Sequence, residues 1–186
     1  TASQTGAHLT VTGDVTLGAD ITVTTDTTGT DGAITFNDAI DGGQSLTLTS
    51  GGGAIKLDGI VGGGSATGLT GLSINATAET GTIEITDIGD ANSLGVTGTV
   101  DIGNSATATL TLDGTNYYTE GVTTYEAATG ANILLTGASP DISTKNDNLA
   151  FNHADIVLST AGTTTIDSEH TASGGGTVTI AGKIDA

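Results

Sequence analysis

Apolar and polar residues alternate along most of this chain, in short runs closed by glycine, asparagine or aspartate. The clearest runs share one pattern: glycine, a small residue, then two apolar residues separated by a polar one. It occurs as GAITFNDAID from Gly32, GAIKLDGIVG from Gly53, GTIEITDIGD from Gly81 and GTVTIAGKID from Gly176. An apolar residue at every second position is the period of a β-strand with one face buried. The residues predicted to point into a core are Ile34, Phe36, Ile55, Leu57, Ile83, Ile85, Val178 and Ile180.

Related strands lie between these copies, so that a strand is expected about every ten residues. They begin at His8, Ala19, Gln44, Gly71, Ala108, Ala131 and Ala154. The closing residues tolerate the positive φ angles that corners need. Short, evenly spaced strands fit either an antiparallel sandwich or a parallel β-solenoid.

The spacing of the copies favours the solenoid. Gly32 and Gly53 are 21 residues apart, and Gly53 and Gly81 are 28 apart, which are plausible lengths for one coil. Asn-Gly signals for tight hairpins are missing. We therefore predict one continuous β-solenoid segment over residues 1–186, with about eight coils, no internal linker and an irregular coil or loop near 117–148, where Pro140 lies. A longer echo relates residues 15–41 to residues 154–185 and indicates a larger repeat array.

Composition supports a thin aliphatic core and restricts the partners. The chain has 30 Gly, one Pro, no Cys and only five aromatic residues. Such a core is typical of solenoids rather than of sandwiches filled with rings. The formal net charge of −18 disfavours binding to nucleic acid, and no stretch is apolar enough for membrane insertion. Without cysteine, disulfides cannot stabilise the fold.

Several strings of the sequence resemble a known family. GAITFNDAIDGGQSLTLTSGGGAIKLDGIVGG, the following GLTGLSINATAETGTIEITDIG and the later NYYTEGVTTYEAATGANILLTG are similar to repeats of giant filamentous-haemagglutinin-like exoproteins and autotransporter adhesins. The resemblance implies a right-handed parallel β-helix and an extracellular, secreted or cell-surface location in Gram-negative bacteria. It implies adhesion, aggregation or filament building, and it brings no catalytic residues.

The chemistry available for catalysis is poor, so we expect no enzyme. A polysaccharide lyase would need more basic groups than Lys56, Lys145 and Lys183. A hydrolase would need paired carboxylates, and the candidates all lie in bends, where Asp usually bonds to the local backbone. These candidates are Asp38, Asp41, Asp58, Asp87, Asp90 and Asp101. A polysaccharide-active β-helix enzyme is the remote alternative.

No cofactor is predicted, and the metal question stays open. His8, His153 and His170 share no metal-ligand spacing. Stacked bends that carry carboxylates such as Asp41 and Asp90 leave a calcium hypothesis without assignable ligands.

Two functional hypotheses remain. In the first, the chain is a structural rod or filament whose partners are its own continuation or further copies end to end, because no capping sequence is visible. In the second, its faces bind a glycan or protein of a host or neighbouring cell.

Overall fold

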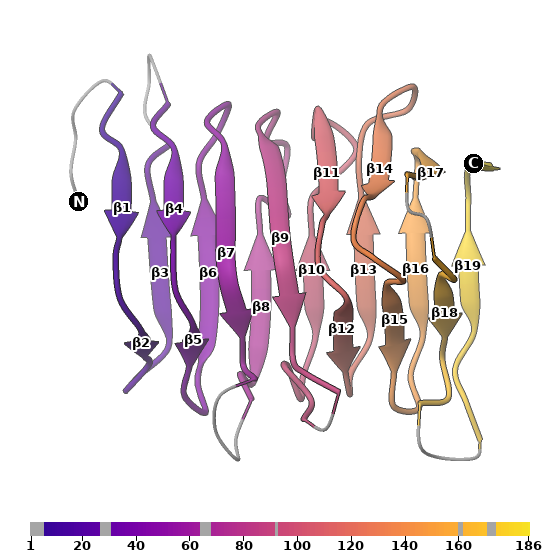
Figure 1. The fold of residues 1–186 in the computed structure, drawn as a ribbon. Coiled ribbons are helices and arrows are strands. Elements are labelled where there is room, and N and C mark those ends of the chain that lie inside the picture. Colours follow the sequence, from indigo (N-terminus) through magenta and orange to yellow (C-terminus); the bar gives the residue numbers. More distant parts are fainter. Residues whose placement is uncertain (1–5, 27–30, 64–67, 92, 160–161, 171–173) are drawn as a thin grey trace.

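The fold is a stack of β-strand coils. The structure, a computed structural model, describes residues 6–26, 31–63, 68–91, 93–159, 162–170 and 174–186. Within these ranges the structure contains β-strands and no helix, and every pairing between two strands is parallel. The predicted parallel β-solenoid is thereby confirmed. In Figure 1 the near strands run downward and the far strands upward while the chain advances from left to right, so the coil is right-handed.

Three faces surround the interior, here called faces A, B and C. Face A contains β1 (Leu9–Val11), β4 (Ile34–Phe36), β7 (Ile55–Val61), β9 (Thr82–Ile88), β11 (Thr109–Leu112), β14 (Asn132–Leu135), β17 (Asp155–Leu158) and β20 (Ile184–Asp185). Face B contains β3 (Ile21–Thr24), β6 (Ser45–Thr49), β8 (Gly71–Ile74), β10 (Val100–Ile102), β13 (Thr123–Glu126), β16 (Leu149–Asn152) and β19 (Val178–Ile180). Face C contains β2 (Val15–Thr16), β5 (Ile40–Asp41), β12 (Asn116–Thr119), β15 (Asp141–Thr144) and β18 (Thr165–Asp167), together with the ends of β7 and β9.

The number of coils follows from the register of the strands on face A. Its first inward position passes from Leu9 through Ile34, Ile55, Ile83, Leu110, Ile133 and Ile156 to Ile184. These steps make seven turns, against about eight predicted. The step from Ile34 to Ile55 spans 21 residues and the step from Ile55 to Ile83 spans 28. The first three GAITF-type copies therefore do lie one coil apart.

The core is a set of stacked aliphatic ladders, because alternate residues of every face point inward. Ile34, Phe36, Ile55, Leu57, Ile83 and Ile85 are all buried, as predicted. Val178 and Ile180 occupy inward positions, in register with Leu149 and Phe151, but Ile180 is only partly buried and Val178 is exposed. Val178 keeps 37% of its surface exposed because β19 pairs with β16 alone among the described residues.

The long sequence echo does not correspond to equivalent places in the fold. The copy at Gly32 forms β4 on face A, whereas the copy at Gly176 forms β19 on face B. Likewise ADITVTT forms β3 on face B and ADIVLST forms β17 on face A. Every face requires the same apolar-polar-apolar strand, so the pattern identifies a strand without identifying its face.

The stretch near 117–148 carries strands β12 to β15 in register with their neighbours. Its irregular point is the turn at Ser139–Pro140, immediately before β15, where Ser139 has a φ of 62°. The expected irregularity is thus confined to a corner.

Coils approach so closely at some corners that a side chain would not fit. A Cβ added at Gly62 would lie 1.8 Å from the carbonyl oxygen of Gly95, and Gly62 also has a φ of 76°. This corner therefore needs glycine for two independent reasons.

Candidate functional site

The N-terminal end face of the solenoid exposes an apolar rung, meaning the aliphatic side chains of one coil that belong to the inward ladders. β1 and β3 each pair on one side only within the described part of the chain. Ile21, the first residue of the inward ladder of face B, keeps 40% of its surface exposed. A hollow of 330 Å³ lies between the two strands, lined by Leu9, Val23 and the residues beside them. Here the aliphatic ladders reach the surface.

The C-terminal end face has matching chemistry. Ile184 of β20 and Val178 of β19 are 51% and 37% exposed. Both continue ladders whose preceding members, Ile156 and Leu149, are completely buried. Each end face therefore presents aliphatic side chains at positions where another coil would cover them.

At both end faces, some backbone groups of the outermost strands have no partner among the described residues. In β1 the amide of Leu9 donates to Ala33 O (2.9 Å), and Val11 O accepts from the amide of Asn37 (3.0 Å). Because peptide groups alternate in direction along a strand, those of Thr10 point to the open side.

β19 is arranged in the same way. Ala181 donates to Phe151 O (2.9 Å) and Thr177 O accepts from Leu149 (3.0 Å), which turns the peptide groups of Val178 to the open side. Such edges are templates for a further parallel strand.

The sides of the solenoid are held by aspartates that bond to the next coil. Asp38 accepts from the amide of Gly13 (2.8 Å), and Asp20 accepts from the amide of Ser45 (2.9 Å). Asp87 accepts from two amides, Thr115 (2.8 Å) and Asn116 (2.7 Å). For Asp38 and Asp87 we predicted bonds to the local backbone, but their partners are 25 to 29 residues away. The aspartates thus clamp neighbouring coils together.

Lys56 and Lys145 take part in surface ion pairs. Lys56 lies 3.1 Å from Asp58 and 2.9 Å from Glu84 of the next coil. The hydrogen bond to Glu84, followed by that to Asp58, raises the pKa of the Lys56 ammonium. Lys145 pairs with Glu120 at 2.8 Å. Because all these side chains are well exposed, each pair contributes little stability.

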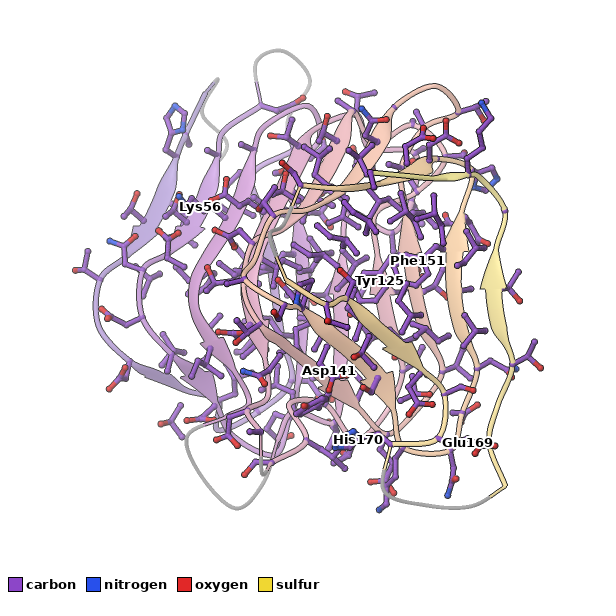
Figure 2. All side chains as sticks on the ribbon, turned by 45° about the vertical axis from the view of Figure 1, so that its right-hand side comes forward. Lys56, Tyr125, Asp141, Phe151, Glu169 and His170 are labelled. Atoms are coloured by element: carbon purple, nitrogen blue, oxygen red, sulfur yellow. The ribbon has the colours of Figure 1, made fainter. Side chains whose placement is uncertain are left out.

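Sequence reasoning missed a small polar cluster on face C, of which Asp141 and His170 are labelled in Figure 2. Tyr118 donates to Asp141 Oδ2 (3.0 Å), and Ser143 donates to Asp141 Oδ1. The ring of His170 stacks on that of Tyr118, with centroids 4.2 Å apart and planes 25° apart. Burial, and then the bond to Asp141, raises the pKa of the Tyr118 hydroxyl to about 12. Tyr118, Ser143 and Asp167 are in register on successive coils. Their spacing of about one coil is the only feature of the sequence that could have indicated this cluster.

The three histidines do not converge. Nδ1 of His8 accepts from the amide of Ala33 (3.0 Å). His153 lies 3.6 Å from Glu126, and His170 is the residue stacked on Tyr118.

The two aspartates of the calcium hypothesis are not on adjacent coils. Asp41 ends β5 and Asp90 follows β9. The coil of β7 lies between them, because the amide of Gly62 donates to Ile40 O and the amide of Gly89 donates to Val61 O. Within the ranges that the structure describes, no three His, Cys, Asp or Glu side chains are grouped closely enough to hold a metal ion.

No family model, no curated protein and no solved structure matches this chain. A search of the described residues for a helix long and apolar enough to cross a membrane finds none. The function must therefore be argued from the surfaces themselves.

Proposed function

We propose that this chain is a structural segment of a secreted bacterial surface protein, a rod that extends by end-to-end stacking of coils. The observation that carries the proposal is the pair of end faces, with exposed aliphatic rungs and strand edges that face away from the solenoid. Its partner is a further coil, supplied by its own continuation or by another copy.

The two end faces complement each other in geometry. Ile21, Val178 and Ile184 all belong to inward ladders, so a coil stacked in register would bury them against like residues. Each buried aliphatic side chain contributes roughly 1.5–3 kcal/mol when it leaves water. Strand pairing would satisfy the open backbone groups in the same step. Contact between unlike ends does not close on itself, so it produces filaments rather than rings.

The lateral surface fits an extracellular role. A net charge of −18 repels parallel rods at low ionic strength and keeps them separate, an effect that salt screens. The lack of cysteine and the resemblance to haemagglutinin-like repeats support export from a Gram-negative cell.

Paired lysine substitutions on the end strands test this proposal. Val178→Lys puts a charge into the apolar rung, whereas Thr179→Lys adds the same charge to the outer side of the same strand, where Thr179 is exposed. Sedimentation and electron microscopy of the chain at physiological ionic strength should show linear assemblies for the parent and Thr179→Lys, and monomers for Val178→Lys. Thermal melting checks that both variants remain folded. Equal assembly of the two variants would refute end-to-end stacking.

A further inference from the structure

A groove on the outer side of face B, here called the Asp101 groove, has chemistry that end-to-end stacking does not use. It crosses β6, β8 and β10 and has a volume of 280 Å³. The side chains and the glycine that shape it belong to Ser45, Thr47, Gly71, Ser73, Thr99 and Asp101. Its volume is close to the lower limit of small-molecule sites, about 300 Å³.

The hollow exists because Gly71 has no side chain. Gly71 is in register with Ser45 on the outer side of the sheet. A Cβ built there would lie 3.3 Å from Ser45 Oγ and 3.7 Å from Thr99 O, and the φ of Gly71 is one that other residues adopt. Neither backbone strain nor a backbone clash therefore demands glycine at this place, in contrast to Gly62.

The groove is lined by polar groups with unused hydrogen-bonding capacity. Thr47, Ser73 and Asp101 are in register on successive coils, so their side chains form a row. Across the described chain, neither the Asp101 carboxylate nor the hydroxyls of Thr47, Ser73 and Thr99 form a hydrogen bond. Thr47, Ser73 and Asp101 are half-buried, and polar groups that are partly withdrawn from water without partners are open to a ligand that supplies them.

The lining defines the chemical class of that ligand. Hydroxyl groups both donate and accept, and a carboxyl group accepts, or donates when protonated. Burial, and then the charge of Glu126, raises the pKa of Asp101, which makes a fixed negative charge less favourable there. Anionic ligands are disfavoured by the acidic chain, and an apolar ligand would leave the row of hydroxyls unsatisfied. A neutral ligand rich in hydroxyl groups satisfies all of these conditions.

We propose that the Asp101 groove binds one residue of a neutral saccharide. Gly71 leaves space for the ring, Asp101 accepts hydrogen bonds from ligand hydroxyls, and Thr47 and Ser73 bond to neighbouring hydroxyls. This site lies on the side of the rod, so its occupation does not depend on contact between end faces.

The experiment uses the full 186-residue chain and four tetrasaccharide probes. Maltotetraose, cellotetraose and mannotetraose are neutral, and tetragalacturonate is the anionic control. Binding is followed by amide chemical shifts at millimolar concentrations of sugar. At least one neutral probe should bind and shift the amides of Thr47, Ser73 and Asp101, whereas tetragalacturonate should not.

Three variants decide whether the groove is the binding site. Gly71→Thr fills it with a residue that suits a strand, and should weaken binding more than tenfold without lowering the melting temperature. Asp101→Ala should weaken binding about tenfold, equal to ~1.4 kcal/mol. Gly43→Thr, where an added Cβ meets nothing within 4 Å, is the matched control and should bind like the parent.

Three results would overturn the proposal. They are no binding by any neutral probe, unchanged binding by a folded Gly71→Thr variant, and tighter binding of tetragalacturonate. Shifts of the same amides on raising the protein concentration alone would assign the groove to a second copy and would also contradict it.

Discussion

Two buried tyrosines of the core differ in one respect that stability measurements can resolve. Tyr117 and Tyr125 both expose 0% of their surface. The hydroxyl of Tyr117 donates to Ile85 O (2.9 Å) and accepts from the amide of Gly114 (2.8 Å). The hydroxyl of Tyr125 has no hydrogen-bond partner among the described residues, although its ring stacks on Phe151 with centroids 5.3 Å apart.

Removing each hydroxyl should therefore change stability in opposite directions. Tyr117→Phe leaves the buried amide of Gly114 without its acceptor and removes one of the two donors to Ile85 O, which keeps its bond from the amide of Asp113 (3.2 Å). The unsatisfied amide costs about 1–3 kcal/mol. Tyr125→Phe removes a polar group that gains nothing in the folded state, so the free energy of unfolding should stay equal or rise by up to about 1 kcal/mol. In a chain of this length 1 kcal/mol corresponds to a shift of about 2–4 °C in melting temperature.

Thermal and urea unfolding of the parent and both variants in the same buffer give the comparison. Both substitutions keep the ring, so lost packing does not confuse the result. The melting temperature of Tyr117→Phe should be the lower of the two by several degrees. An equal loss in Tyr125→Phe would show that its hydroxyl has a partner, such as a water enclosed in the core, and would refute the reasoning.

Three further predictions follow from packing and ionisation. Ile83→Asp places an unpaired charge in the middle of an inward ladder and should lower the free energy of unfolding by more than about 4 kcal/mol in a urea titration; unchanged unfolding would contradict the inward assignment. Gly62→Ala should cost at least about 2 kcal/mol, because it combines positive φ with the contact to the next coil, whereas Gly43→Ala should melt like the parent. All three tyrosines have a raised pKa in the folded chain, that of Tyr118 to about 12, because burial disfavours the phenolate. Between pH 10 and 12 the unfolded chain loses these protons first, so stability falls as pH rises. Absorbance at 295 nm should stay flat near pH 10, Tyr118 should ionise around pH 12, and Tyr117 and Tyr125 should ionise only when the chain unfolds; a titration of all three near pH 10 in the folded chain would contradict it.

The strand pattern was enough to predict the fold class, but it could not assign strands to faces. Ile34, Ile55 and Ile83 were recognised as one ladder because their copies repeat at coil spacing. The copy at Gly176 has the same pattern but lies on another face, since coil lengths vary and only pairing determines the register.

The surfaces were harder to predict than the ladders. Tyr118, Asp141 and His170 meet because three coils stack, and nothing in their local sequence indicates it. The Asp101 groove depends on the absence of a side chain at Gly71, which among 30 glycines has no signal of its own. Residues whose role depends on neighbours a coil away need the register before they can be found.

Cryo-electron microscopy of assemblies formed by the chain tests the central claim most directly. If copies stack so that β20 of one pairs with β1 of the next, the eight strands of face A continue into the next copy, which predicts an axial rise of about 38 Å per copy and an unbroken spacing of about 4.8 Å between the strands of face A. Monomers at every ionic strength, or assemblies joined through their sides with both end faces exposed, would contradict the account.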